Sequence, residues 1–194
     1  MSFRNSIILF VVFMGIGLGF LISVRNGIYP VAVVNSDVIT MKSIDKSFSA
    51  AYTYYQNALL VYGRDPNELK TTESLMEIKR ATLDKLVVDS LILKELKKRV
   101  NGQEYTAIAE KNIQNVLDSN KGIEDASKKL YGLDFPDFRQ MVLEPQAYRE
   151  ILQGRMFLNN ENFDEWLNKA RADAFVVILS PSLKWDGNQV KFGK

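Results

Sequence analysis

Residues Ser74 to Val100 read SLMEIKRATLDKLVVDSLILKELKKRV, and this stretch decides the fold. It contains neither Gly nor Pro, and residues of high helix propensity dominate it. Leu86, Leu93 and Val100 recur at heptad spacing, and further apolar residues widen their stripe: Leu83, Val87 and Leu96. The pattern predicts one amphipathic helix with a broad buried face, roughly 40 Å long at about 1.5 Å per residue. Because so long a face can be buried only against other segments, we expect the rest of the chain to pack along it.

The composition excludes several classes of function. The chain has 25 Lys+Arg against 23 Asp+Glu and no long basic run, so nucleic acid is a poor candidate for a partner. It contains no Cys and no His, which excludes Cys nucleophiles, disulfides, Ser-His-Asp triads and Cys/His zinc sites. Asp84 and Asp89 are five residues apart, so their carboxylates do not face each other on a helix. No phosphate-binding glycine loop is present in the sequence. We therefore expect a protein that is not an enzyme and that uses no metal or other cofactor.

An apolar segment lies near the start of the chain. Residues 6–24 (SIILFVVFMGIGLGFLISV) are uncharged and approach the ~20 residues that cross a bilayer. The run is long for a signal peptide and no A-x-A cleavage site appears, so an uncleaved membrane anchor is favoured over a cleaved signal. Gly15 and Gly19 form a G-x-x-x-G, which permits self-association in the membrane, although membrane helices also tolerate glycine without pairing. We expect residues 1–25 to form the anchor (or signal segment) and residues 26–194 to form one domain.

The domain is predicted to be mainly α-helical, with strands at its ends. Residues 31–34 (VAVV) and 38–40 (VIT) predict two short strands joined by a tight turn. Further helices are expected at residues 42–62, 105–117, 123–131, 138–158 with a kink at Pro145, and 162–172. Residues 175–179 (FVVIL) are all apolar, which predicts a strand covered on both faces. Asp186 and Gly187 predict a hairpin turn between two weak strands, which we expect to be an appendage to the core.

Three stretches together resemble the N-terminal chaperone domain of SurA-type proteins, which PpiD-type and PrsA-type foldases share and which the C-terminal domain of trigger factor resembles more remotely. Val31–Thr40 (VAVVNSDVIT) is similar to the family's opening V-A-x-V-N-G-x-x-I-T, with Ser36 in place of the Gly. Leu83–Arg99 (LDKLVVDSLILKELKKR) resembles the family's long helix, and Phe163–Leu179 (FDEWLNKARADAFVVIL) resembles its closing helix and strand. In that family the last strand returns to pair with the first. The resemblance therefore implies a multi-helix SurA-like chaperone domain with a small β-sheet that pairs the N-terminal and C-terminal strands.

The chain departs from this family at one place. Most of these foldases carry a parvulin-type prolyl isomerase domain before the closing helix, and Met156 leads almost directly into Phe163 here. Parvulin sites typically use His, which this chain lacks. The resemblance therefore implies peptide binding without isomerase activity.

These features predict a membrane-anchored chaperone-like protein that binds unfolded or exported polypeptides without ATP. The membrane contact is expected through residues 6–24, with the domain on the extracytoplasmic side, in the periplasm of a bacterial cell envelope. The alternative is a non-catalytic scaffold or adaptor that binds one fixed partner in an envelope or secretion complex. A groove lined by adaptable residues favours many clients, whereas one flat apolar patch favours a single partner.

Aromatic residues are the candidates for peptide binding, because they offer apolar area with little loss of conformational freedom. The candidates are Phe48, Tyr52, Tyr54, Tyr55, Tyr62, Phe135 and Phe138. Those on one helical face, from Phe48 to Tyr62, can instead pack against the long helix, while Tyr54 lies off that face and is the better candidate for exposure. Phe135 and Phe138 can alternatively form a hydrophobic staple at a helix start. Trp166 is expected in the core, against the opening strands.

Overall fold

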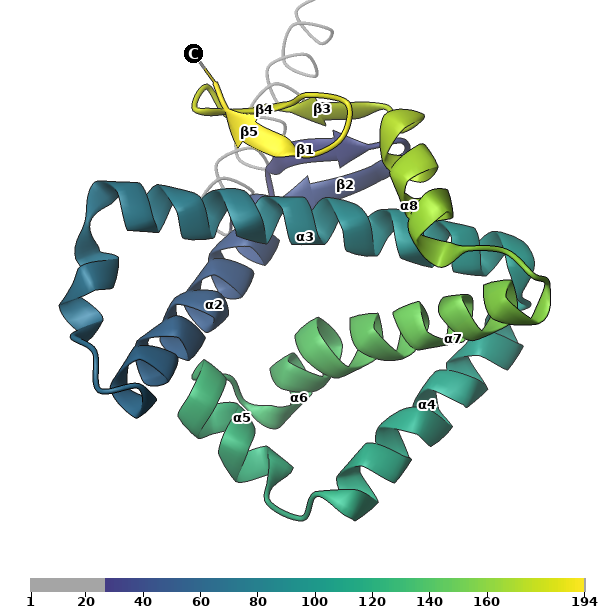
Figure 1. The fold of residues 1–194 in the computed structure, drawn as a ribbon, viewed down its shortest axis with the longest axis horizontal. Coiled ribbons are helices and arrows are strands. Elements are labelled where there is room, and N and C mark those ends of the chain that lie inside the picture. Colours follow the sequence, from purple (N-terminus) through teal and green to yellow (C-terminus); the bar gives the residue numbers. More distant parts are fainter. Residues whose placement is uncertain (1–26, 194) are drawn as a thin grey trace, which may run out of the picture.

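The computed structural model describes residues 27–193, and the predicted membrane segment, residues 6–24, lies outside this range. The described chain is mainly helical and carries two small antiparallel sheets. Helix α3 crosses the molecule, with the sheets on one side of it and most of the other helices on the other side (Figure 1). No helix within residues 27–193 is both long enough and apolar enough to cross a bilayer.

The elements follow the predicted order, with residue ranges as follows. They are β1 (Pro30–Val34), β2 (Asp37–Thr40), α2 (Met41–Val61), the 3-10 helix η1 (Pro66–Lys70), α3 (Thr72–Arg99), α4 (Gly102–Ser119), α5 (Ile123–Tyr131), α6 (Phe135–Phe138), the π-helical turn η2 (Arg139–Leu143), α7 (Glu144–Leu158), α8 (Phe163–Ala172), β3 (Val176–Ile178), β4 (Leu183–Trp185) and β5 (Val190–Phe192). Pro145 lies in the first turn of α7, and the expected kink takes the form of the π-helical turn directly before it.

Helix α3 carries two buried stripes where the sequence predicted one broad face. Its N-cap is Thr71, whose hydroxyl oxygen accepts the backbone N–H of Ser74 at 3.1 Å. The first stripe packs against the sheets and consists of Leu83, Val87 and Leu91. The second consists of Val88, Ile92 and Leu96, and it packs against the other helices in a core that we call the helical cluster. One residue separates the two series, which corresponds to about 100° around the helix, so α3 separates two hydrophobic clusters.

Strand β3 pairs with β1, as predicted. The three-stranded sheet has the order β2-β1-β3, and both pairings are antiparallel. Ala32 lies opposite Ile178, and Val34 lies opposite Val176. The inner face of this sheet packs against the first stripe of α3, and we call this core the sheet cluster. The two ends of the described chain are thereby joined, with the helices between them.

The prediction that residues 175–179 would be covered on both faces is wrong. Val176 and Ile178 pack into the sheet cluster, whereas Phe175, Val177 and Leu179 are exposed. The segment alternates because β3 is an edge strand of a sheet that has α3 on one face only. An unbroken apolar run therefore did not distinguish a sandwiched strand from a half-exposed one.

The predicted hairpin exists, but it is part of the core and not an appendage. Strands β4 and β5 pair antiparallel, and Leu183 and Val190 are buried in the sheet cluster. Asp84 of α3 accepts the backbone N–H of Val190 at 2.9 Å, and Arg80 donates to the carbonyl of Val190 at 2.9 Å. Arg171 of α8 donates to the carboxylate of Asp84 at 3.3 Å. Side chains of α3 and α8 therefore fix the hairpin in place.

The prediction that Trp166 packs against the opening strands is wrong. It is half-buried against the helical cluster, and its ring lies 5.5 Å from that of Phe163. The reason is that α8 packs along the later part of α3, beside α7. Trp185 of the hairpin is the tryptophan that packs against the sheet cluster.

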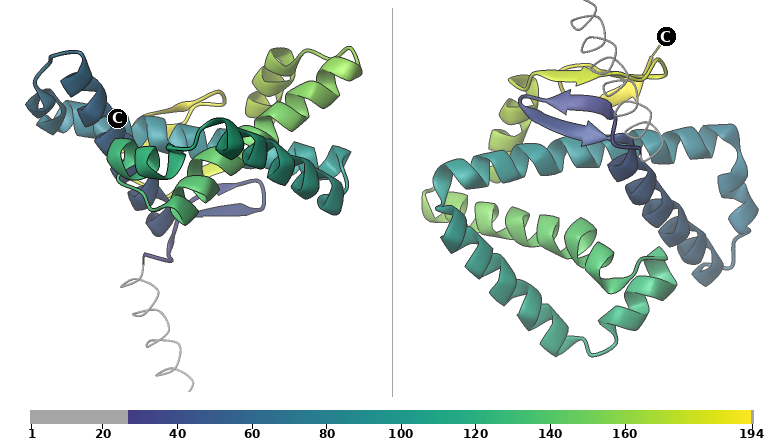
Figure 2. Two further views of the ribbon diagram at one scale, coloured as in Figure 1. Left: turned by 90° about the horizontal axis from the view of Figure 1, so that it is seen from below. Right: turned by 180° about the vertical axis from the view of Figure 1, so that it is seen from behind.

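Helices α4 to α7 return the chain toward α2. Helix α7 packs against both α3 and α4, and its buried residues Leu152 and Met156 fill the helical cluster. This return brings α5 beside α2, as the front and back views show (Figures 1 and 2). The contact between α2 and α5 is the seam on which the candidate site lies.

Candidate functional site

The seam between α2 and α5 is tightly fixed. The side-chain amide of Asn57 donates to the carbonyls of Lys129 and Leu130, at 2.8 and 3.1 Å, at the C-terminal end of α5. Gly132 ends that helix with a φ of 66°, and a Cβ at this position would lie 3.4 Å from the hydroxyl oxygen of Thr53. The left-handed backbone conformation favours glycine at this position, and the distance to Thr53 shows that the end of α5 lies in contact with α2. The seam is therefore a defined surface between helices distant in sequence.

A row of aromatic rings crosses the seam from solvent to core. Tyr55 meets Tyr54 edge to face at 5.9 Å, and Tyr54 stacks on Tyr131 at 5.1 Å. Tyr131 in turn contacts Phe138 at 5.2 Å. Tyr55 and Tyr54 are 45% and 42% exposed, whereas Phe138 is 6% exposed. Two solvent-facing tyrosines therefore rest on a buried aromatic support, which limits their rotation.

These tyrosines line a pocket of about 340 Å³ that we call the tyrosine groove. Its lining side chains come from α2, α3, α5 and η2. They are Ser47, Ala50, Ala51, Tyr54, Tyr55, Lys85, Tyr131, Met141 and Val142. Among these described lining residues, Lys85 alone is charged, and it forms an ion pair with Asp89 on the same helix. Small alanines, aromatic rings and a flexible methionine suit an apolar segment of variable sequence.

The concave surface continues past Tyr55. The ring of Tyr55 also lines a second pocket of about 400 Å³, which is bounded by η1 and the start of α3. The other residues of that pocket are Leu69, Glu73, Ser74, Glu77, Ile78 and Ala81. Tyr55 therefore stands between two adjoining hollows, one apolar and one with an acidic rim.

The hydroxyl of Tyr131 lies in a partly buried environment. Burial raises the pKa of Tyr131, and the neighbouring Tyr54 raises it further. A tyrosine hydroxyl in the groove can both donate a hydrogen bond to a peptide backbone and accept one from it.

The predicted peptide-binding residues between Phe48 and Tyr62 divide into three groups. Tyr54 and Tyr55 line the groove. Phe48 and Tyr52 stack on each other at 6.1 Å and are half-buried, and Phe48 lines a separate pocket of about 290 Å³ between α2 and α3. Tyr62 is 80% exposed at the end of α2 and lines neither groove pocket. The helical face from Phe48 to Tyr62 is thus neither wholly packed nor wholly open.

The second predicted pair belongs to the core. Phe135 is half-buried against the helical cluster. The prediction that Phe138 contacts a peptide is wrong, because only 6% of it is exposed and it supports Tyr131 from within. Sequence reasoning missed Tyr131, Met141 and Val142, which reach the groove from α5 and η2. An aromatic residue directly before the helix-ending Gly132 was the one signal available for Tyr131.

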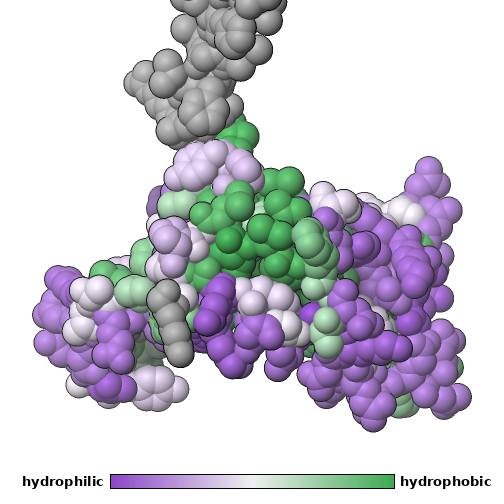
Figure 3. All heavy atoms as spheres, turned by 90° about the horizontal axis from the view of Figure 1, so that it is seen from above, coloured by the Kyte–Doolittle hydropathy of each residue, from purple (hydrophilic) through white to green (hydrophobic). Residues whose placement is uncertain are grey.

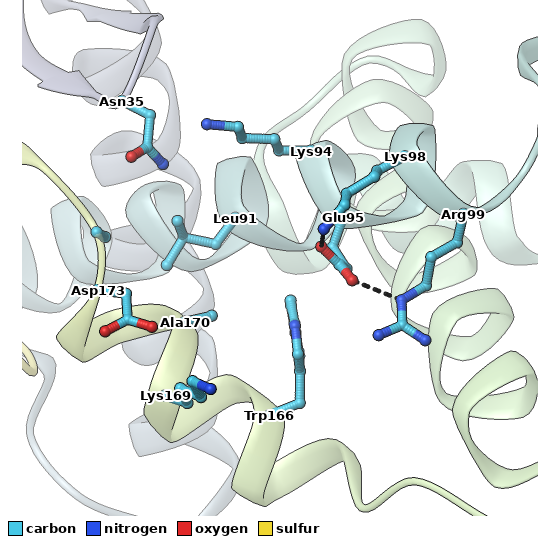
Figure 4. A pocket seen from close by; sticks show the side chains of 11 residues that line it. Asn35, Leu91, Lys94, Glu95, Lys98, Arg99, Trp166, Lys169, Ala170 and Asp173 are labelled. Atoms are coloured by element: carbon cyan, nitrogen blue, oxygen red, sulfur yellow. Dashed lines mark hydrogen bonds and ion pairs between the residues drawn. The ribbon is translucent and has the colours of Figure 1, made fainter. Parts of the chain in front are cut away.

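Another hollow, of about 590 Å³, lies between α3 and α8 (Figure 4). Trp166 projects from α8 toward α3 there, among basic side chains that include Lys94, Lys98 and Lys169. Glu95 accepts from Arg99 at 2.5 Å, and Arg99 also donates to Glu161 at 2.6 and 2.8 Å.

Arg99 lies between two carboxylates, those of Glu95 and Glu161. Its hydrogen bonds with Glu161 and Glu95 raise the pKa of Arg99, and those with Arg99 lower the pKa of Glu161. Glu161 precedes α8, so this pair fixes the start of that helix on the end of α3. The hollow is thus lined by many charged side chains, which fits an apolar peptide less well than the tyrosine groove does.

Comparisons with models of protein families, with curated proteins and with solved structures found no match. The resemblance to SurA-type chaperones therefore rests on the three sequence stretches quoted above. Within residues 27–193, no group of three or more His, Cys, Asp or Glu residues is placed to hold a metal ion.

Proposed function

We propose that this chain is a membrane-anchored chaperone-like protein that holds unfolded or exported polypeptides in the tyrosine groove. Holding requires no ATP, no cofactor and no covalent chemistry, only transient burial of apolar side chains of the client. We place the domain on the extracytoplasmic side of the membrane, because the resemblance is to exported foldases and an apolar segment precedes the domain.

The exposed tyrosine pair is the observation that carries this proposal. Tyr54 and Tyr55 stay nearly half exposed although the rings beneath them are packed. A protein that used them only for stability would gain from burying them, since apolar burial is worth about 25 cal/mol per Å². Rigid aromatic rings beside a hollow are instead typical of surfaces that bind other polypeptides.

Two further features support the proposal. The antiparallel pairing of β1 with β3 is the arrangement that the resemblance to SurA-type chaperones implies. The groove also contains hydroxyl groups and one lysine beside its apolar side chains, so it can accept segments that differ in sequence.

The affinity should be weak enough for release. A client that buries two or three apolar side chains gains about 1.5–3 kcal/mol for each of them. Association and ordering cost several kcal/mol, so dissociation constants in the micromolar range or weaker are expected. Weak binding of this kind lets a client leave and fold without an energy source.

The test measures binding of unrelated fluorescent peptides, each rich in Phe and Leu, to the full chain in lipid nanodiscs, with empty nanodiscs as the blank. Tyr54→Ser combined with Tyr55→Ser should weaken binding about tenfold or more, because two hot-spot aromatics are lost. Tyr62→Ser is the matched control, since it removes an exposed tyrosine of the same helix outside the groove, and it should leave binding unchanged. Tyr55→Ser alone provides a milder variant, and the melting temperature of each variant checks that it folds.

The outcomes separate holding from the adaptor alternative. Similar micromolar affinity for several unrelated peptides, lost in the double variant, supports the proposal. If folded wild-type protein binds none of the peptides, or if the double variant binds like the Tyr62 control, the tyrosine groove is not a client site. The same preparations should not accelerate proline isomerisation in a test peptide.

A further inference from the structure

The outer face of the three-stranded sheet carries a continuous row of apolar side chains. Val33 of β1 lies opposite Val38 of β2 and opposite Val177 of β3. Phe175 and Leu179 stand two residues before and two residues after Val177. Both continue the hydrogen-bond ladder with β1. The backbone N–H of Asn35 donates to the carbonyl of Phe175 at 2.7 Å, and the N–H of Leu179 donates to the carbonyl of Val31 at 2.8 Å. Because side chains two residues apart share a face, we call these five side chains (Val33, Val38, Phe175, Val177 and Leu179) the outer sheet face.

This face is open to solvent in the described part of the chain. Val38, Phe175, Val177 and Leu179 are 57%, 64%, 36% and 57% exposed. The space-filling view shows a hydrophobic patch at this place, surrounded by polar surface (Figure 3). A contiguous apolar face that stays uncovered marks a contact surface or invites aggregation, so we expect something to cover it.

The chain enters the domain directly beside this sheet. The backbone N–H of Lys42 donates to Gly27 at 2.7 Å, and that of Met41 donates to Tyr29 at 3.0 Å. These bonds fix the first described residues against the start of α2. Five residues separate Val24, the end of the apolar segment, from Pro30, where β1 begins, so the two positions are at most about 20–22 Å apart.

We propose that the outer sheet face lies on the lipid surface of the membrane that residues 6–24 enter. The apolar side chains insert among the acyl chains near the headgroups, and the short tether supplies a high local concentration of lipid. The exposed ring of Tyr29, at the start of the sheet, suits the interfacial layer where tyrosines are enriched.

This placement orients the whole domain. The inner face of the sheet packs on α3, so the outer face points away from α3 and from the helices beyond it. The tyrosine groove is lined largely by residues of α2, α5 and η2. Helices α2 and α5 extend on the side of α3 opposite the sheet (Figure 1). Docking of the sheet on lipid therefore leaves the groove directed away from the membrane and open to clients.

The size of the patch favours lipid over a second copy of the chain. A stable interface between proteins takes about 20–30 residues from each side, and the outer sheet face offers five. A tethered domain needs far less, because the covalent link has already removed most of the cost of association.

The experiment uses the absence of Cys from the chain, which allows single labelling sites. Val38→Cys places an environment-sensitive fluorophore on the outer sheet face. Val61→Cys, 80% exposed at the far end of α2 and about 30 Å from that helix's start, is the matched control. The full chain is reconstituted into phosphatidylcholine and phosphatidylglycerol vesicles with nitroxide-labelled lipids, which quench fluorophores within the bilayer surface.

We expect strong quenching at position 38 and none at position 61. A second variant carries the label at position 38 together with Val177→Asp and Leu179→Asp. Because two apolar contacts with lipid become charges, the ratio of chains docked on lipid to undocked chains should fall by about tenfold or more. The matched control Leu60→Asp, an exposed leucine of α2, should leave quenching unchanged.

Three results would overturn the inference. The first is equal quenching at positions 38 and 61. The second is self-quenching between labels at position 38 without quenching by lipid, which assigns the face to a second copy. The third is release of the chain from vesicles by an alkaline wash, which shows that residues 6–24 do not anchor it. None of these readouts depends on client binding, so failure here is distinct from failure of the tyrosine groove.

Discussion

Replacement of Leu183 by Ala tests whether the C-terminal hairpin belongs to the core. Leu183 is 5% exposed and lies in the sheet cluster beside the fully buried Val190. Truncation of a buried leucine to alanine costs about 2–5 kcal/mol, because the lost transfer free energy and the cavity left behind add up. For a chain of this length, that corresponds to a fall of roughly 4–20 °C in the melting temperature.

The control is the same substitution at an exposed leucine. Leu60 is 59% exposed on α2, and its replacement by Ala should change stability by less than about 0.5 kcal/mol. Unfolding is followed in urea by tryptophan fluorescence of the full chain in a mild detergent, since Trp185 packs against the sheet cluster and reports its loss. The urea concentration at the midpoint of unfolding should fall for Leu183→Ala and stay unchanged for Leu60→Ala.

The result that would refute the reasoning is an equal, small shift for both variants. It would mean that β4 and β5 contribute little to folding, and that the sheet cluster ends at β3. A large shift in both variants would instead show that exposure does not decide the cost at these positions.

Two further predictions concern the same end of the chain. Hydrogen bonds from Lys191, and from the backbone N–H groups of Gln189 and Asn188, lower the pKa of Asp186 from its ordinary value of 3.8. The stabilisation from this carboxylate is therefore present above that value and is lost as the pH falls below it, so the melting temperature should drop less between pH 5 and pH 3 in Asp186→Asn than in the wild type. Truncation after Ala172 removes β3 as well as the hairpin, which leaves β1 and β2 as a marginal pair. The truncated chain should be insoluble or melt far below the full chain, and an unchanged melting temperature would remove β3 from the core.

Much of the helical framework could be predicted from the sequence. The long helix begins two residues before the expected Ser74, because an unbroken run of helix formers acts locally. The glycine at position 132 ends α5 as expected, since its left-handed conformation is a property of that residue. The strands β1 and β2 were likewise predictable from β-branched residues, and their pairing with β3 followed from the family resemblance.

The candidate site was predictable only in part. The aromatic residues of α2 were identified, but the periodicity that groups them gives a helical face and not the element opposite that face. Tyr55 is exposed and Phe138 is buried because the return of α5 to α2 decides which rings are covered. Tyr131 reaches Tyr54 from a helix more than seventy residues away in the chain, and no local pattern encodes that contact.

The sequence by itself determined the local elements of this protein: where helices start and stop, which stretches extend, and that one helix is too long to stand alone. Only the tertiary structure decided how α3 divides its apolar residues between two clusters, that the weak hairpin is core, and that the outer sheet face stays open. The physical reason is that propensity, capping and turn chemistry act over a few residues. Burial, in contrast, depends on all the segments that reach a given place, and these are far apart along the chain.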